Sequence, residues 1–346
     1  MRHNLGIDLG NSFVRLSSME EGILLREIAM VALNRNDGTL VDVGADAEKH
    51  LLAGDPCACV RPFRQGIVSR CDLTQAVLEH CLLKMQKTGE IRLLMSVPCQ
   101  FDDIAEAALN EVASLSGVTE PYQIASPLAA MIGSGINPND GCIAVDIGAT
   151  QTNILITCRG QVLHAATVKS GGEQFDVAIA EYVRSHYRIK VSLRTAEAIK
   201  QRIGSVWVGL EKNAIEVRGK AISDDAPVSF RLSSQEMFNA LEEPTAAILE
   251  GICVGISRIP PEFVNPVFAQ GILLTGGGSM LTGLDKMISG VTGVAATVGP
   301  HPTDAVAVGL ARISPRLPRQ IKPGVRNITG AFLRSLFVNE TNQRRI

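Results

Sequence analysis

The sequence predicts an α/β protein made of two similar halves. An apolar phrase that ends in Asp, an apolar residue and Gly occurs twice, at residues 5–10 and again at residues 143–148. An apolar run of this length is typical of a buried strand, and Asp with Gly at its end favours the tight turn of a hairpin. Strand and helix patterns alternate after each copy, and 346 residues that are 46% apolar can bury two medium-sized cores.

The first half is expected to span residues 1–140. Its first strand returns over residues 13–16, and a turn-rich stretch over about 30–62 is predicted to be a small insertion. Apolar spacing and capping residues then predict a helix from Thr74, a strand over 91–97, a helix capped by Asp102 whose buried face is Ile104, Ala108, Val112 and Leu115, and a small-residue helix over 128–133.

The second half, residues 141–313, repeats this order. A hairpin from Cys142 leads to a third strand near 162–168 and a helix after Gly171-Gly172, and an insertion is expected over about 178–235. Residues 272–275 are predicted to form a strand that runs into a glycine-rich turn, residues 276–279, before another helix. A strand, a glycine run and a helix start together predict a cradle for a phosphate or a nucleoside.

Composition and motif content exclude several classes of protein. The net charge of −2 gives no drive toward nucleic acid, so no nucleic-acid partner is expected. We find no signal peptide or bilayer-spanning apolar stretch, which predicts a cytoplasmic protein. The eight cysteines lack zinc-finger spacing and are expected to be reduced. No His-Glu-x-x-His or Gly-x-Ser-x-Gly phrase occurs, which sets aside metalloprotease and serine hydrolase chemistry.

The two hairpin turns are the strongest functional signal. A turn of this kind points backbone N–H groups outward as an anion nest, and the carboxylate of Asp8 or Asp146 beside it can hold a hydrated cation near a phosphate. Two such turns that face each other would clamp a nucleotide polyphosphate. The alternative is a duplicated α/β fold with an empty cleft.

These phrases resemble the phosphate-1, phosphate-2 and adenosine motifs of the actin, Hsp70 and sugar-kinase superfamily, and within it the chain resembles the bacterial MreB family. The supporting stretches occur in MreB order and spacing over about residues 5–313. Besides the two hairpins, they are residues 61–68, 129–135, 171–176, 195–205 and 274–278.

The resemblance implies an actin-like ATPase fold, in which two duplicated ribonuclease-H-like domains with four subdomains surround a nucleotide cleft. It implies ATP and Mg²⁺ as ligands, self-assembly into filaments that scaffold cell shape and peptidoglycan synthesis, and cell-wall elongation membrane proteins as partners. Asp8 and Asp146 would face the hydrated Mg²⁺. The residues around the nucleotide would be Gly10, Asn11, Ser12, Phe13, Gly148, Ala149, Thr150, Gln151, Glu197, Lys200, Gly276, Gly277, Gly278 and Ser279.

Two of these residues also have a simpler interpretation. Glu197 and Lys200 lie three residues apart on one helix face, from which a carboxylate and an ammonium could both reach a ribose or an adenine. The alternative is that they form a solvated ion pair with each other.

The chain departs from the family pattern where ATP would be cleaved. MreB proteins resemble one another in a Glu-Glu-Pro phrase, one glutamate of which positions the attacking water, whereas this chain has Ala125-Ser126-Pro127. Alanine has no acceptor and serine is weakly basic, so hydrolysis should be slow or absent. Ala149 also occupies a glycine position, where a side chain is expected to strain the second loop by about 1 kcal/mol and weaken its contact with phosphate.

The membrane features of the family are missing or displaced. No N-terminal amphipathic helix precedes the first strand, and the connection over residues 86–89 is short and polar. The tail over 314–346 is basic, and its segment 326–337 is predicted to be an amphipathic helix that lies on a membrane, docks in a partner's groove or packs on the first domain. Membrane contact would place the protein at the inner face of the membrane. The apolar face consists of Ile328, Phe332, Leu333, Leu336 and Phe337.

The leading prediction is an MreB-like filament protein with weak ATP hydrolysis. One alternative is a pseudo-ATPase that acts as an adaptor or co-polymer of a conventional MreB. Another is a small-molecule kinase of the same fold, with Asp102 or Asp103 activating a substrate hydroxyl, although both residues also suit a helix cap and first turn. An Hsp70-type chaperone would need a peptide-binding module, which is not found in this sequence.

Overall fold

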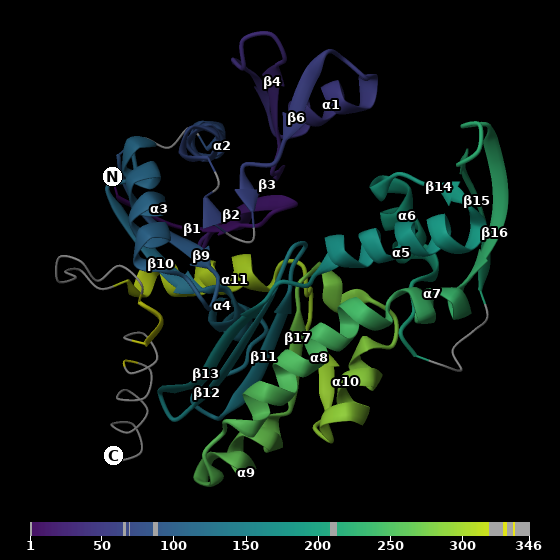
Figure 1. Cartoon of the computed structure of the whole chain (residues 1–346). Helices are drawn as coiled ribbons and strands as arrows, with labels where there is room; N and C mark the ends of the chain where they lie inside the picture. Colours follow the sequence, from purple (N-terminus) through teal and green to yellow (C-terminus); the bar gives the residue numbers. More distant parts are fainter. Residues whose placement is uncertain are drawn as a thin grey trace.

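The computed structural model describes residues 2–64, 67–68, 70–85, 89–207, 213–317, 328–330 and 335. Two five-stranded sheets form its centre (Figure 1). The first sheet has the order β10-β9-β1-β2-β3, and the second has the order β13-β12-β11-β17-β18. The strands of the first are β1 (Arg2–Leu9), β2 (Phe13–Ser18), β3 (Gly22–Ile28), β9 (Glu90–Val97) and β10 (Glu120–Ala125); those of the second are β11 (Cys142–Ile147), β12 (Thr152–Cys158), β13 (Gln161–Val168), β17 (Ile272–Thr275) and β18 (Ala296–Val298).

The two sheets repeat one topology. Each begins with an antiparallel hairpin, β1–β2 or β11–β12, and the next strand in the chain continues that meander. Two later strands then join in parallel on the other side of the first strand. The doubled sequence phrase therefore marks the equivalent strands β1 and β11, and the predicted duplicated α/β architecture is confirmed.

Each half carries a smaller sheet at its periphery, and Figure 1 shows the two standing apart at the top and right of the molecule. The first contains β4 (Val31–Asn34), β5 (Leu40–Val43) and β6 (Cys57–Val60) with helix α1 (Ala45–Ala53); the hairpin β7 (Phe63–Arg64) and β8 (Ile67–Val68) follows. The second contains β14 (Ile189–Lys190), β15 (Ala214–Ala221) and β16 (Pro227–Ser233).

The start of the second insertion differs from the prediction. Residue 178 falls in the middle of helix α5 (Gly172–Tyr187), and the small sheet begins after it, at Ile189. The helix continues because Phe175, Ile179 and Val183 keep one apolar face buried through this point.

Helices α2 (Cys71–Lys84) and α3 (Asp103–Leu115) pack together beside the first sheet. Asp102 caps α3 as predicted, because its carboxylate accepts from the amide of Ala105 at 2.8 Å. The predicted face was confirmed at Val112 and wrong at both ends of the helix. Ile104 and Leu115 are 81% and 62% exposed, and the buried residues are Ala105, Leu109, Val112 and Ala113.

The remaining helices of the second half surround its sheet. Helix α6 packs against α5, α8 covers β12 and β13, and α9 lies against β11 and β12. No helix in the described ranges is long and apolar enough to cross a bilayer. Their bounds are α6 (Leu193–Ile203), α7 (Ser234–Ala240), α8 (Glu242–Ser257), α9 (Pro261–Gln270) and α10 (Leu284–Thr292).

Two helices, one from each half of the chain, each pack against the sheet of the other half. Helix α4 (Ser126–Gly133) follows the first sheet but packs against β11 and β12, whereas α11 (Ala305–Ile313) follows the second sheet and packs on β1 and β2. They cross in close contact: a Cβ on Gly133 would lie 1.9 Å from the carbonyl oxygen of Ala305, and one on Gly309 would lie 1.8 Å from that of Ala129. The halves therefore share a core at this crossing.

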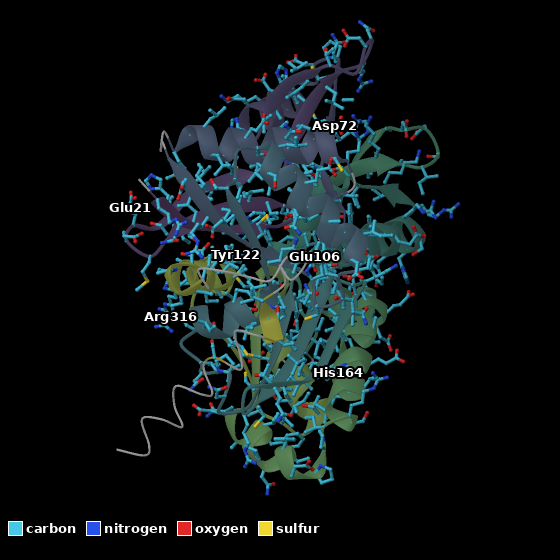
Figure 2. The ribbon with its side chains drawn as sticks, turned by 90° about the vertical axis from the view of Figure 1, so that its left-hand side faces the viewer. Glu21, Asp72, Glu106, Tyr122, His164 and Arg316 are labelled. Atoms are coloured by element: carbon cyan, nitrogen blue, oxygen red, sulfur yellow. The ribbon has the colours of Figure 1, made fainter. Side chains whose placement is uncertain are left out.

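The described part of the tail reaches the same shared core. The amide of Ile328 donates to Gln123 of β10 at 2.8 Å, and Thr329 Oγ1 accepts from Ala125 at 2.9 Å. Ile328 is 2% exposed and belongs to the apolar cluster around α4 and α11. Figure 2 shows this side of the molecule, with Tyr122 of β10 labelled. Of the three alternatives for this segment, Ile328 therefore follows the one in which the tail packs on the protein itself. The other residues of the predicted apolar face over 326–337 lie outside the described residues.

Candidate functional site

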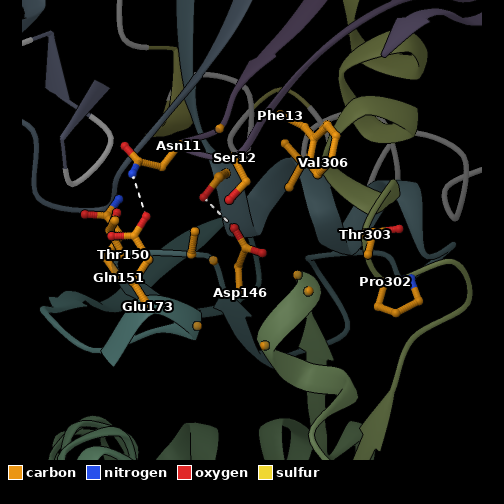
Figure 3. Close-up of a pocket in the computed structure, with 18 of the residues that line it drawn as sticks. Asn11, Ser12, Phe13, Asp146, Thr150, Gln151, Glu173, Pro302, Thr303 and Val306 are labelled. Atoms are coloured by element: carbon orange, nitrogen blue, oxygen red, sulfur yellow. Dashed lines mark hydrogen bonds between the residues drawn. The ribbon is translucent and has the colours of Figure 1, made fainter. Parts of the chain in front are cut away.

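A cavity of about 540 Å³ lies between the two halves, and residues of both sheets line it (Figure 3). Almost every residue expected around a ligand lies in its wall. The exception is Ser279, which is 1% exposed and donates to the carbonyl of Gly276 at 2.7 Å, so it supports the glycine turn from behind. The expected residues in the wall are Asp8, Gly10, Asn11, Ser12, Phe13, Asp146, Gly148, Ala149, Thr150, Gln151, Glu197, Lys200, Gly276, Gly277 and Gly278.

The two hairpin loops have equal length. Strand pairing ends at Leu9 and Val14 in the first hairpin and at Ile147 and Thr152 in the second, which leaves loops over 10–13 and 148–151. The second loop is fixed to the start of α5, because the carbonyls of Gly148 and Ala149 accept from the amides of Gly172 and Glu173. These bonds hold the loop in one conformation without a ligand.

The expected strain at Ala149 is not present. The non-glycine residues with positive φ in the described chain are Arg159, Arg188, Asp225 and His301, so Ala149 has an ordinary backbone conformation. The amides of Ala149 and Thr150 have no hydrogen-bond partner in the part of the chain that the structure describes. An anion could accept from them at no cost in backbone strain.

The third glycine turn leaves open space at its tip. Gly276 has φ +79° and sits so close to β11 that a Cβ would lie 2.3 Å from the carbonyl oxygen of Ile147. A Cβ on Gly277 would meet nothing within 4 Å, since this residue borders the cavity. The first position therefore requires glycine, and the second leaves room for a ligand.

A carboxylate lies one residue before the end of the first strand of each sheet; Asp146 is buried, and the Asp8 side chain is 14% exposed. Ser96 donates to Asp8 at 2.8 Å. Ser126 and Thr275 donate to Asp146 at 2.9 and 3.2 Å, and the dashed line at Asp146 in Figure 3 is the first of these two bonds. Burial raises the pKa of Asp8, and burial together with the charge of Asp8 raises the pKa of Asp146 to about 6. Two carboxylates that repel each other in a buried site favour a cation between them.

The residues present fit a Mg²⁺ ion. Asp8 and Asp146 offer oxygen ligands from both walls, as Mg²⁺ usually takes one or two carboxylates and completes its shell with water and phosphate. Among the described residues, no cluster of three or more His, Cys, Asp or Glu side chains forms an all-protein metal cage. The ligand set therefore suits a cation that enters with a polyphosphate.

Lys200 has a partner that sequence spacing missed. Its Nζ lies 2.8 Å from Asp176 and donates to the carbonyl of Gly172 at 2.9 Å, so it pairs with α5 and not with Glu197. Burial raises the pKa of Asp176 to about 6, although Lys200 opposes the shift. Glu197 is exposed and accepts from Gln201 at 3.5 Å. The alternative interpretation, an ion pair between Glu197 and Lys200, is therefore wrong, and both residues line the cavity.

Three other residues of the wall were not among the predicted site residues: Glu173, Arg61 and Arg15. Asn11 Nδ2 donates to Glu173 across the cavity at 3.2 Å (Figure 3), and Arg61 donates to the carbonyl of Asn11 at 2.7 Å. Arg15 lies 3.5 Å from Asp8. The strand pairing of residues 8 and 15 could have indicated this last contact, because a hairpin places them side by side.

Ser126 and Ala125 occupy different surroundings. Ser126 lines the cavity beside Asp146, whereas Ala125 is not among the lining residues, and its amide binds Thr329. Of the two positions where the family has glutamate, Ser126 is therefore the one from which a side chain reaches the cavity.

Two repeated α/β sheets around a cleft with paired hairpin loops define an actin-like protein. The fold matches MreB5 of Spiroplasma citri bound to ADP, with a TM-score of 0.85 and 24% identity over 90% of this chain and 96% of that chain. It also matches the MamK double helical filament, with a TM-score of 0.79 and 21% identity over 92% and 100%.

The chain belongs to the MreB/Mbl protein family, whose model matches residues 2–321. The cell shape-determining protein MreB of Escherichia coli strain K12 is 33% identical over 89% of this chain and 92% of its own length. The cell shape-determining protein Mbl of Bacillus subtilis strain 168 is 30% identical over 88% and 94%. The family resemblance expected from the sequence is confirmed.

Proposed function

We propose that this protein binds ATP with Mg²⁺ between its two halves, and polymerises into filaments that scaffold cell shape and peptidoglycan synthesis while hydrolysing ATP slowly or not at all. The observation that carries the proposal is the pair of equal hairpin loops with Asp8 and Asp146 at the cavity. The ADP bound to the Spiroplasma relative and the filament formed by MamK support it.

Each part of the cavity wall has a separate role in this proposal. The free amides of Ala149 and Thr150 donate to phosphate oxygens, and Gly277 leaves room for the nucleoside. Mg²⁺ would neutralise charge on the phosphates while Asp8 and Asp146 hold its water shell. The side-chain amide of Asn11 donates one N–H to Glu173, and its second N–H could donate to a phosphate oxygen.

Weak hydrolysis follows from the side chain at residue 126. In-line attack needs a group that orients a water and accepts its proton. Ser126 Oγ donates its proton to Asp146 and accepts from Asn153 at 3.4 Å, and a hydroxyl is too weakly basic at neutral pH to accept a proton from an attacking water. The nucleotide then acts as a slowly reset switch for assembly.

Nucleotide binding and assembly test the central proposal together. ATP binding is measured by calorimetry with magnesium chloride, and filaments are sought by electron microscopy with ATP, with ADP and without nucleotide. We expect micromolar binding or tighter and filaments that depend on ATP. A protein that binds no ATP, or stays monomeric at high concentration in every nucleotide state, contradicts the proposal.

Restoring the glutamate tests the hydrolysis defect. We expect Ser126→Glu to raise the turnover of bound ATP by about a hundredfold or more, because a positioned general base contributes on that scale. Ala125→Glu is the matched control, and we expect no gain from it because residue 125 does not line the cavity. Equal rates for both variants and the wild type would locate the defect elsewhere in the site.

A pseudo-ATPase that co-polymerises with a conventional MreB is the second candidate. It is favoured by the same engagement of Ser126 and by the bond between Asn11 and Glu173, which joins the two halves across the cavity. The two proposals differ in what assembles. Filaments of this protein alone support the first, and incorporation only into filaments of a conventional MreB supports the second.

The proposed cellular position is the cytoplasm, with contacts to membrane proteins of cell-wall elongation. Ile328 is packed in the shared core, so contact of Ile328 itself with a membrane would require its release. Sedimentation with anionic vesicles measures that contact directly.

A further inference from the structure

Arg15 lies in a row of charged side chains at the wall of the cavity. Strand pairing places it beside Asp8 of β1 and beside Arg26 of β3. Its Nη1 lies 3.5 Å from Asp8, and its Nε donates at 3.1 Å to Asp304, which precedes helix α11. The Arg15 side chain is 14% exposed and lines the cavity, so its charge acts where water screens it poorly.

The charge balance explains why a cation is needed at this position. Asp8 and Asp304 contact Arg15, and the charge of Arg15 lowers the pKa of both carboxyl groups and of Asp146. A polyphosphate that enters the cavity brings further negative charge toward the same carboxylates. Its binding depends on counter-charge, which a metal ion or a fixed guanidinium can supply.

Arg26 shows what a purely structural partner of Asp304 looks like. Its Nη2 donates to Asp304 at 2.7 Å, but its side chain is 57% exposed and is not among those that line the cavity. Both arginines therefore hold Asp304, while Arg15 also contacts Asp8 and faces the ligand space. This difference separates a role in binding from a role in packing.

We propose that Arg15 is a fixed cation of the nucleotide site, whose guanidinium supplies part of the charge neutralisation that Mg²⁺ gives to a bound polyphosphate. The inference rests on the proposed binding of ATP. A planar guanidinium has five N–H donors, and two of them can donate side by side to phosphate oxygens. The contacts of Arg15 with Asp8 and Asp304 do not use all five. The consequence is that ATP binding by this protein tolerates removal of the metal.

The test compares ATP binding in magnesium chloride with binding in EDTA. For the wild type, we expect EDTA to raise the Kd of ATP by about tenfold or less, since a charge-assisted contact of this kind is retained. For Arg15→Met, we expect EDTA to raise the Kd of ATP by about a hundredfold or more, because neither Mg²⁺ nor a guanidinium then offsets the charge beside Asp8. Arg15→Lys keeps the charge and is expected to restore most of the tolerance.

Arg26→Met is the matched control, because it removes the other partner of Asp304 and leaves the cavity wall intact. Its response to EDTA should equal that of the wild type. A melting curve of each variant without nucleotide shows whether it is folded, and Arg15→Gln, which also removes the charge, replaces Arg15→Met in the comparison if Arg15→Met is not folded. A structural ion pair would lower the melting temperature of Arg15→Met without changing its ratio of Kd values.

The possible failures are distinguishable. If Arg15→Met and the wild type respond equally to EDTA, the inference about Arg15 is refuted while ATP binding stands. If the wild type binds no ATP in either buffer, the proposed function is refuted and this inference falls with it.

Discussion

Replacing Gly309 with alanine is expected to force apart the two helices that join the halves of the molecule. A Cβ at this position of α11 would lie 1.8 Å from the carbonyl oxygen of Ala129 in α4, about half of an ordinary van der Waals separation. The neighbouring atoms are backbone on both sides of the crossing, so no side chain can rotate away.

The magnitude follows from two opposed effects. Overpacking a tight core costs about 1–3 kcal/mol, and contact with rigid backbone places this substitution at the upper end of that range. Alanine gains about 1 kcal/mol over glycine in a helix interior, which offsets part of the loss. We expect a net loss of about 2 kcal/mol, which would lower the melting temperature by about 3 °C in a chain of 346 residues.

Gly290→Ala in helix α10 is the matched control. Gly290 is exposed, and the nearest atoms to a Cβ there belong to Trp207 at 3.8 Å, so the methyl group has room. This variant should gain about 1 kcal/mol from helix propensity alone. Thermal melting of both variants, followed by circular dichroism, checks the pair. A shift of the same sign and size for the two would refute the argument from the helix crossing.

Two further substitutions test the site and the tail. Lys200→Met should cost about 2–3 kcal/mol at pH 8, because it strands the buried Asp176 carboxylate, and less as the pH falls through 6. The loss becomes smaller at low pH because the pKa of Asp176 is raised, so the ionised form is the one that destabilises the folded state. Equal losses of unfolding free energy at pH 8 and pH 5, measured by urea unfolding, would contradict this prediction. Ile328→Ala should cost about 2–4 kcal/mol, because it empties a site in the shared core. Leu83→Ala, at a residue 76% exposed, should change little, and an equally silent Ile328→Ala would instead favour the membrane-bound tail.

Local signals in the sequence predicted which residues line the cavity. An apolar strand that ends in Asp and Gly depends on turn chemistry within a few residues, and both copies formed loops of the same length with their aspartates at the cavity. The glycine turn at 276–278 was likewise predicted from neighbouring residues alone. These features need no knowledge of distant parts of the chain.

Features that depend on distant partners were not predicted. The prediction that Ile104 lies on the buried face of α3 was wrong. Ile104 fits the apolar period of the helix, but its side chain is exposed at the helix start. The pairing of Lys200 with Asp176 requires α5 and α6 to be adjacent, which spacing within one helix cannot reveal. Arg15 and Asp304 are brought together from opposite ends of the sequence in the same way.

The exchange of α4 and α11 between the halves also determines when the chain can fold during its synthesis. The face of β1 and β2 that begins at the N-terminus is covered by α11, and the edge of β10 is paired by Ile328 and Thr329 near the other end. The first half therefore waits for nearly the whole polypeptide before its sheet is enclosed, and contacts of such long range close slowly. A ribosome-bound chain that stops before residue 305 would expose this apolar face, whereas one that has released residue 330 would have all the described segments that cover it.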